Sequence, residues 1–253
     1  MTNAASTSPT AALMIVGNEI LSGRTKDANL AYLGEKLGAV GIQMREARVV
    51  PDIDKEIITT VRALSARYTY VFSTGGIGPT HDDITAACIA EAFGTVLERN
   101  PEAEAMLRSH YDDPAKLTEA RLKMAEVPVG AELIANPVSK APGFRLANVY
   151  VMAGVPKIMQ AMLDNILPTL EGGKPFISRT VTGAVREGDI AGGLGALQAE
   201  HPDLDIGSYP YYQDGKFGTS IVVRGLNETE IDEVVDRVVQ LMEDLGVSPS
   251  AVG

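Results

Sequence analysis

Residues 68–85 read YTYVFSTGGIGPTHDDIT, and this stretch decides the fold. It passes from an apolar run typical of a buried strand, through a turn with three glycines, into a segment whose apolar residues recur at helical spacing. Closely spaced glycines at the carboxyl end of a parallel strand let the backbone approach a ligand, and the following helix N-terminus attracts anions. The stretch therefore predicts a phosphate-binding turn. Because it has neither the dinucleotide glycine pattern nor a Walker A lysine, it leaves the class of phosphate ligand open.

The same alternation of strand and helix continues on both sides of this turn. Apolar runs predict strands at 11–17, 42–50, 68–74, 131–135 and 144–152. Helical spacing predicts helices that start near Asp27, near Asp52 or Asp54, and near Asp82, two more within 101–126, and another at 155–170. This order predicts an α/β fold, namely a three-layer, doubly wound, mostly parallel sheet with helices on both faces.

The pattern changes after Pro168. Strands are predicted at 177–185, 205–212 and 219–225, and helices at 187–200 and 229–245. We therefore expect three regions, which are a disordered N-terminus at 1–10, the α/β domain at 11–169, and a small α+β domain at 170–253. The β-α-β-β-α order and the G-x-x-G shape of Gly192–Gly195 make the small domain KH-like, although its acidic surroundings argue against RNA.

Composition narrows the classes of partner. The 253 residues include 33 acidic and 22 basic side chains, a net charge of −11 that repels nucleic-acid backbones and anionic lipids. One cysteine and three histidines exclude an intramolecular disulfide and a Cys/His zinc site. The sequence shows neither an apolar run of membrane-helix length nor a signal-peptide pattern. We expect a cytoplasmic protein with no nucleic-acid or membrane partner.

Two adjacent carboxylates follow the glycines of the turn. Asp82 and Asp83 would repel a phosphate unless a cation lay between them and the ligand. Mg²⁺ accepts one or two carboxylates together with phosphate oxygens and water, so these aspartates predict a site for Mg²⁺ or a similar divalent metal. The structural alternative is that Asp82 caps the next helix and Asp83 complements its dipole.

A second loop, GNEILSGRTKDAN at 17–29, follows the first predicted strand. In a doubly wound sheet this loop and the glycine turn leave the same edge, so both could face one ligand. The candidate ligand-binding residues of the two loops are Gly17, Asn18, Glu19, Ser22, Gly23, Thr74, Gly75, Gly76, Gly78, Pro79 and Thr80. Asp27 joins Asp82 and Asp83 as a candidate catalytic carboxylate, and Asp52 lies on the same edge. The structural alternative for Asp27 is a helix cap.

Together the two loops resemble the molybdopterin-binding fold family, specifically the amino-terminal domain of competence/damage-inducible protein A and similar stand-alone proteins. Asn136, the Ala-Pro-Gly at 141–143, the Gly-Val-Pro at 154–156 and the Ile-Gly-Ser-Tyr-Pro at 206–210 extend this resemblance over nearly all of 11–245. The resemblance implies a three-layer α/β domain that often forms homo-oligomers. It also implies a small nucleotide or pterin ligand over the carboxyl edge of the sheet.

The resemblance further implies an activity. Related domains of this branch are associated with metal-dependent hydrolysis of ADP-ribose, or of FAD in the similar domain fused to eukaryotic FAD synthase. Carried over by motif, Asp83 matches the metal-associated aspartate, while Gly75, Gly76 and Gly78 match the phosphate loop. Glu19, Ser22, Gly23 and Asp27 match the first loop. The leading expectation is a metal-dependent hydrolase of a nucleotide diphosphate such as ADP-ribose or FAD.

Three positions depart from the pattern of this branch. Ala153 stands where proline is usual, Ile158 where glutamate is common, and Ser139 where glycine often occurs. Loss of the glutamate could remove a polar contact, so a second hypothesis is a protein that binds molybdopterin or a nucleotide without turning it over. A third is an adenylyl or molybdate transferase of molybdenum-cofactor biosynthesis, which shares the same glycine loop.

Overall fold

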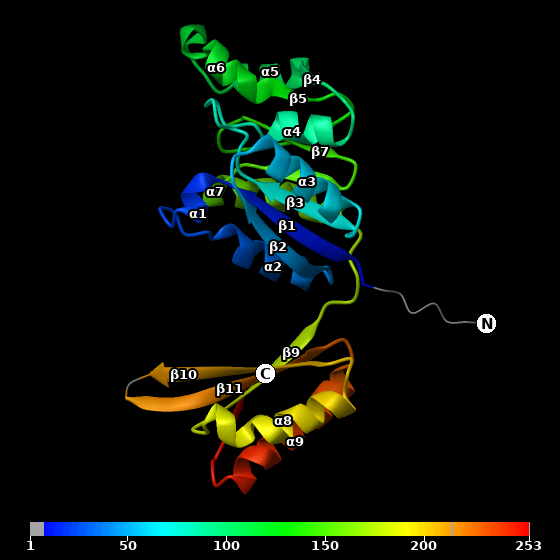
Figure 1. Cartoon of the computed structure of the whole chain (residues 1–253), viewed down its shortest axis with the longest axis vertical. Helices are drawn as coiled ribbons and strands as arrows, with labels where there is room; N and C mark the ends of the chain where they lie inside the picture. Colours follow the sequence, from blue (N-terminus) through cyan, green and yellow to red (C-terminus); the bar gives the residue numbers. More distant parts are fainter. Residues whose placement is uncertain (1–7, 214, 253) are drawn as a thin grey trace, which may run out of the picture. The chain divides into compact units, whose positions relative to one another are not determined.

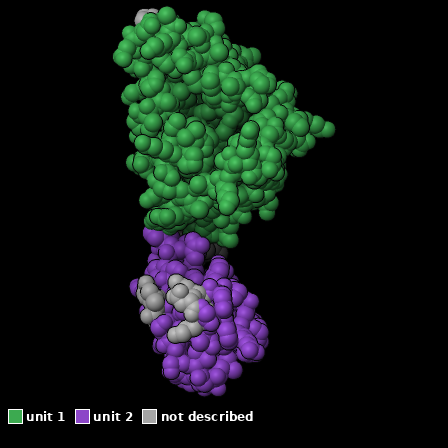
Figure 2. All heavy atoms as spheres, turned by 90° about the vertical axis from the view of Figure 1, so that its left-hand side faces the viewer, with its two compact units in different colours: residues 1–173 green, residues 174–253 purple. Residues whose placement is uncertain are grey.

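The computed structural model describes residues 8–213 and 215–252. The chain divides into two compact units, Met1–Gly173 and Lys174–Gly253, shown in different colours in Figure 2. Of the predicted disordered N-terminus, residues 1–7 lie outside the described part of the chain. The prediction is wrong for Thr10, which begins the first strand and pairs with Gln43.

Unit 1 contains a six-stranded sheet in the order β2-β1-β3-β8-β7-β6. Figure 1 labels β1, β2, β3 and β7 of this sheet. The strands are β1 (Thr10–Val16), β2 (Gln43–Val50), β3 (Tyr70–Thr74), β6 (Glu132–Ile134), β7 (Gly143–Leu146) and β8 (Val149–Met152). β2, β1, β3 and β8 run parallel to one another, whereas β7 runs antiparallel to both β8 and β6. The predicted mostly parallel sheet is confirmed.

Helices cover both faces of this sheet, because successive side chains of a buried strand point to opposite sides. In β1, Ala12, Met14 and Val16 pack with helices α3 (Asp54–Ser65) and α4 (Thr85–Ala92). The alternate residues Ala11, Leu13 and Ile15 pack with α2 (Asn29–Ala39) and α7 (Pro156–Ile166). A short helix α1 (Asn18–Leu21) follows β1, and a 3-10 turn η3 (Leu167–Thr169) follows α7. The predicted three-layer arrangement is confirmed.

Residues 97–128 form a small module beside α4, which we call the insertion module. Its elements are β4 (Leu97–Arg99), α5 (Pro101–Arg108), η1 (Pro114–Lys116), α6 (Glu119–Leu122), η2 (Lys123–Ala125) and β5 (Glu126–Pro128). β4 pairs antiparallel with β5, and Ala103, Leu107, Leu122 and Ala125 form a separate buried cluster. Helices α5 and α6 were both expected. Strands β4 and β5 were not, because three residues are too few to show the alternation of apolar and polar residues that is typical of a strand.

The apolar stretch at 144–152 forms two strands. β7 and β8 pair antiparallel around a tight turn at Ala147, whose φ of 52° is left-handed. The pattern did not predict this hairpin, because alanine is not one of the residues that usually adopt positive φ in such turns.

Unit 2 is an antiparallel sheet in the order β10-β11-β9-β12, packed against two helices. The elements are β9 (Ile177–Gly183), α8 (Glu187–Glu200), β10 (Asp205–Gln213), β11 (Lys216–Gly225), α9 (Glu228–Asp244) and β12 (Ser250–Val252). The β-α-β-β-α order is confirmed, and β12 is an addition. Gly192–Gly195 lies inside α8, so its G-x-x-G shape does not form the loop of a KH module.

Candidate functional site

The candidate site lies where the parallel strands of unit 1 end. Backbone hydrogen bonds join the loops that leave this edge: Gly17 N donates to Val50 O at 3.1 Å, and Gly75 N donates to Met152 O at 3.2 Å. Because β1 is flanked by β2 and β3, the first loop and the glycine turn start on neighbouring strands. The expected common edge is therefore present, as in other doubly wound sheets.

The glycines of the turn are required by close contacts. Gly75 has φ 95°, and a Cβ there would lie 2.2 Å from Val16 O. Gly76 has φ 69°, and a Cβ there would lie 2.1 Å from Thr85 Oγ1. Thr85, the first residue of α4, closes the turn by donating from N to Gly76 O at 3.0 Å and from Oγ1 to Gly75 O at 3.1 Å. A side chain at Gly75 would collide with the backbone of Val16, and one at Gly76 would collide with the side chain of Thr85.

Thr80 brings the two adjacent carboxylates together. Its N donates to Asp83 Oδ2 at 2.8 Å, and its Oγ1 lies 2.6 Å from Asp82 Oδ1 and 2.5 Å from Asp83 Oδ2. The hydrogen bond from Thr80 holds the pKa of Asp82 below its ordinary value. The Asp83 carboxylate also lies against Gly78, where a Cβ would come within 2.6 Å of Oδ2. Since α4 begins only at Thr85, the capping alternative for Asp82 is not observed.

These carboxylates fit one kind of metal site. Asp82 and Asp83 reach the same hydroxyl, so both could contact one cation whose other ligands are phosphate oxygens and water. Within residues 8–213 and 215–252, no group of three or more His, Cys, Asp or Glu side chains converges on a metal position. The arrangement therefore fits an ion that arrives with an anionic ligand, and does not fit an ion held by protein ligands alone.

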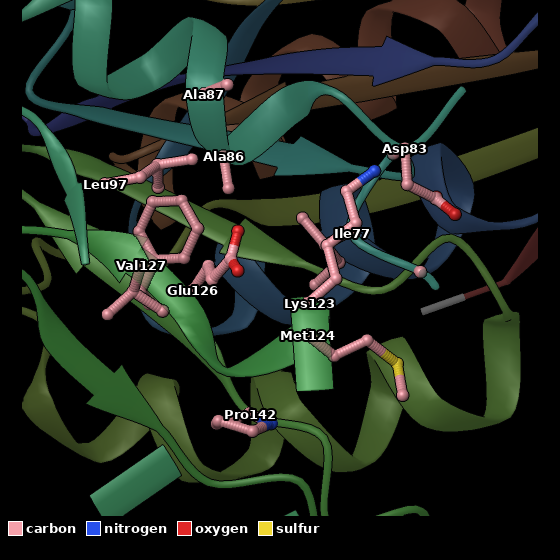
Figure 3. Close-up of a pocket in the computed structure, with 13 residues that line it drawn as sticks. Ile77, Asp83, Ala86, Ala87, Leu97, Lys123, Met124, Glu126, Val127 and Pro142 are labelled. Atoms are coloured by element: carbon pink, nitrogen blue, oxygen red, sulfur yellow. The ribbon is translucent and has the colours of Figure 1, made fainter. Parts of the chain in front are cut away.

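A small pocket lies beside the glycine turn (Figure 3). Its lining includes Gly76, Gly78 and Asp83 from the turn and Lys123 and Glu126 from the insertion module. The pocket encloses about 40 Å³, whereas small-molecule sites usually measure about 300–1,000 Å³. A nucleotide would thus extend beyond it over the edge of the sheet.

Lys123 is a charged residue of this pocket that sequence reasoning missed. Its Nζ donates to Thr80 O at 2.7 Å, although the two residues lie 43 positions apart in the chain. Figure 3 shows its side chain running toward the segment that carries Asp83. An isolated lysine in a segment of helical pattern carries no signal that it meets a glycine turn, so only the tertiary structure reveals it.

The first-loop candidates mostly stabilise their own loop. Asn18 N donates to Asp52 Oδ2 at 2.9 Å, and Leu30 N donates to Asp27 Oδ2 at 2.9 Å, which caps the start of α2. Ser22 Oγ donates to Glu19 O at 3.2 Å. The remaining candidates of the two loops, Gly23 and Pro79, are both exposed. These residues lie at the expected edge of the sheet. The hydrogen bonds described for them join protein groups at that edge to one another.

Buried polar groups lie at the start of α2 and at the end of β3. Asn29 Nδ2 donates to Gly154 O at 2.9 Å, which ties α2 to the turn before α7. The side-chain oxygens of Asn29, Ser73 and Thr74 are buried and find no hydrogen-bond partner within the part of the chain that the structure describes. Unpaired buried polar atoms are rare in proteins, so they make Asn29 and Thr74 candidate ligand contacts.

The three departures from the family pattern are accommodated by local packing. Ala153 and Ile158 pack against the cluster between the sheet and helices α2 and α7. Ser139 Oγ accepts a hydrogen bond from Asn136 Nδ2 at 2.7 Å. Ile158 therefore contributes an apolar contact at a position where the branch often has a carboxylate.

Two family models match consecutive segments of the chain. Residues 12–172 match the family described as "Probable molybdopterin binding domain", and residues 175–250 match "FAD synthase, middle domain". A protein from Archaeoglobus fulgidus is 35% identical over 92% of this chain and 97% of its own length. A "Probable FAD synthase" from Caenorhabditis elegans is 29% identical over 93% of this chain and 50% of its own length.

A solved structure agrees with these sequence matches. The crystal structure described as "the protein CinA with unknown function from Thermoplasma acidophilum" has 38% sequence identity and a TM-score of 0.60. The similarity covers 64% of this chain and 98% of that one. Sequence and structure together show that this chain belongs to the molybdopterin-binding domain family, in its CinA-like branch, and carries after it a domain related to the middle domain of FAD synthase.

Proposed function

We propose that the chain binds a nucleotide diphosphate at the glycine turn and hydrolyses it with a divalent metal, with ADP-ribose and FAD as the first substrates to test. The observation that carries this proposal is the pair of carboxylates that Thr80 holds beside a turn built for close backbone approach. The match of residues 175–250 to the FAD synthase middle domain supports a nucleotide-related ligand.

In this proposal each part of the turn has a separate task. The backbone at Gly75, Gly76 and Gly78 would approach the phosphates without a side chain in between, and the N-terminus of α4 favours their negative charge. Asp82 and Asp83 would hold the metal, which when bound polarises a phosphoryl oxygen. Asp27 is the candidate base for the attacking water, and it lies on the loop of the neighbouring strand β1.

A binding protein without turnover is the second candidate. A specific observation favours it, namely that Asp83 Oδ2 already accepts a hydrogen bond from Thr80 N and lies 2.5 Å from Thr80 Oγ1. A carboxylate used to close a turn need not take part in chemistry. Calorimetry with ADP-ribose, followed by analysis of the ligand after long incubation, separates the two candidates, because hydrolysis releases AMP.

Asp83→Asn tests the proposed hydrolysis. The amide oxygen can still accept the hydrogen bond from Thr80 N, so the turn should persist while the carboxylate charge is lost. We expect AMP release from ADP-ribose or FAD with Mg²⁺, Mn²⁺ or Co²⁺ to fall about 100-fold, and a chelator to abolish it in the wild type. Asp164→Asn, an exposed aspartate of α7, is the matched control. Equal turnover by Asp83→Asn would refute the assignment.

The other expectations about partners stay predictions. A homo-oligomer and the absence of nucleic-acid and membrane partners rest on the resemblance and on the net charge of −11. None of the helices within the described residues combines the length and apolar character needed to cross a bilayer. Gel filtration with light scattering would measure the oligomeric state.

A further inference from the structure

The glycine turn presents an electrostatic problem for an anionic ligand. Asp82 and Asp83 lie at the turn, and the chain as a whole carries a net charge of −11. A diphosphate that enters this region meets like charges, which disfavour binding unless positive charge faces it. Among the residues that line the pocket beside the turn, Lys123 is the one with a permanent positive charge.

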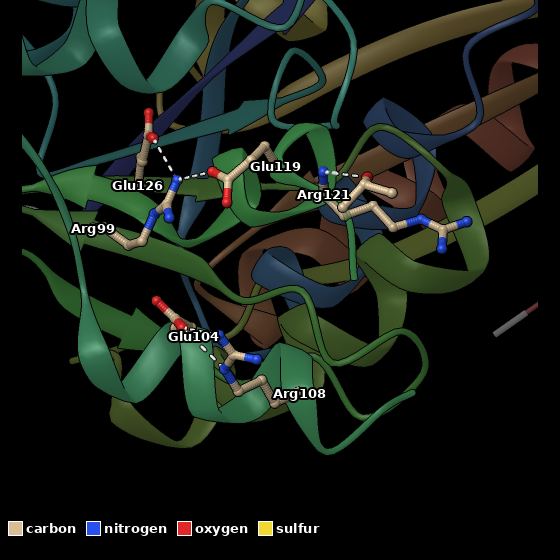
Figure 4. A network of polar contacts seen from close by, with 7 residues as sticks. Arg99, Glu104, Arg108, Glu119, Arg121 and Glu126 are labelled. Atoms are coloured by element: carbon tan, nitrogen blue, oxygen red, sulfur yellow. Dashed lines mark hydrogen bonds and ion pairs between the residues drawn. The ribbon is translucent and has the colours of Figure 1, made fainter. Parts of the chain in front are cut away.

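The insertion module holds Lys123 in place. Its neighbours Leu122 and Ala125 are buried in the module's own cluster. Arg99 of β4 ties the surrounding elements together, with Nη2 2.9 Å from Glu119 Oε2 and 3.6 Å from Glu126 Oε1 (Figure 4). The backbone that carries Lys123 is therefore fixed on both sides, and its side chain is directed to the turn.

The ammonium group of Lys123 keeps donors available. A lysine has three N–H donors, and the described bond to Thr80 O uses one of them. No ion pair within 4.0 Å found among the described residues involves its Nζ, although its charge helps to lower the pKa of Asp82. The remaining donors can thus act on a ligand held at the turn.

We infer that Lys123 is a ligand-binding residue that recognises the diphosphate of the ligand from beside Thr80, at the end of the glycine turn. This inference rests on the proposed function and adds to it a specificity: the site selects ligands that carry phosphate, through a cation supplied by the insertion module. A nucleoside without phosphate would gain nothing from Lys123.

Equilibrium binding to three variants of the whole chain tests this inference. Calorimetry with Mg²⁺ and ADP-ribose compares the wild type with Lys123→Met, Lys123→Arg and the control Lys116→Met, an exposed lysine of the same module. We expect Lys123→Met to raise the Kd for ADP-ribose about 10- to 100-fold. Lys123→Arg should restore most of the affinity, and Lys116→Met should bind as the wild type does. The Kd of Lys123→Met should also depend less on salt, because the variant lacks the charge–charge attraction that salt screens in the wild type.

The outcomes separate this inference from the proposed hydrolysis. If the wild type binds ADP-ribose, fails to release AMP and loses affinity in Lys123→Met, hydrolysis is refuted and the role of Lys123 is supported. If Lys123→Met binds within twofold of the wild type, or binds more weakly with unchanged salt dependence, the inference is overturned. If the wild type binds neither ADP-ribose nor FAD, both the proposed function and the inference fail.

Discussion

At the scale of single residues, Glu46 shows how the fold controls an ionisation far from the candidate site. Tyr68 Oη donates to Glu46 Oε2 at 2.6 Å, and Arg48 Nε donates to Glu46 Oε1 at 2.6 Å. The bond from Tyr68, followed by that from Arg48, lowers the pKa of Glu46, and the same bond raises the pKa of Tyr68. The Tyr68 contact joins β2 to the turn before β3, two strands that are separated in the sheet by β1.

Glu46→Gln should make the stability of unit 1 less dependent on pH. A lowered folded pKa stabilises the protein above the unfolded value of about 4.3, and that contribution is lost as the pH falls through the folded pKa. A raised pKa of Tyr68 adds stability below about pH 10, which is lost as the pH rises through its folded value. We expect the Tm difference between wild type and variant to be largest between about pH 4.3 and about pH 10. Glu35→Gln, at an exposed site, is the control. A constant Tm difference from pH 3 to 11 would contradict the prediction.

At the scale of elements, α8 has more glycine than a stable helix needs. Cβ atoms added at Gly188, Gly192 and Gly195 would have no other atom within 4 Å, whereas one at Gly193 would lie 2.8 Å from Leu241 of α9. Gly193 therefore lets α8 and α9 pack closely. The exposed glycines have no such contact to explain them.

Gly195→Ala should stabilise unit 2 by about 0.5–1 kcal/mol, because alanine loses less backbone entropy in a helix than glycine does. Gly193→Ala is the paired comparison and should stabilise less or destabilise, since its Cβ requires Leu241 to move. Urea unfolding followed by circular dichroism measures both free energies. A loss of stability in Gly195→Ala would show that the exposed face of α8 is constrained by something other than helix propensity.

At the scale of the whole molecule, each unit has its own hydrophobic core. The sheet of unit 1 is packed on both faces, whereas Val181, Ile221 and Val223 of unit 2 pack against its two helices. All candidate site residues, including Asp83 and Lys123, belong to unit 1. We therefore expect unit 1 to fold and to bind its ligand on its own.

A fragment that ends at Gly173 should fold and bind ADP-ribose with a Kd within about twofold of the whole chain, since an unchanged set of contacts leaves the binding free energy unchanged. Circular dichroism and calorimetry on the fragment and on the whole chain check this. A folded fragment that binds at least tenfold more weakly would place part of the ligand site on the middle-domain-like unit.

The sequence predicted the fold and part of the site from local patterns. The alternation in β1, the glycines at 75, 76 and 78 and the adjacent carboxylates are all visible in a short window of residues. The hairpin at Ala147, the strands β4 and β5 and the fourth strand of unit 2 gave no local signal, because short strands are stabilised by pairing and not by their own composition.

What the sequence alone determined is which residues form the glycine turn and to which edge of the sheet that turn belongs. The tertiary structure decided what each polar group contacts. Asp27 caps α2, Thr80 gathers Asp82 and Asp83, and Lys123 reaches the turn from a distant module. The physical reason is that backbone conformation follows from neighbours in the chain, whereas hydrogen bonds and charge contacts depend on separations of a few ångströms that only packing sets.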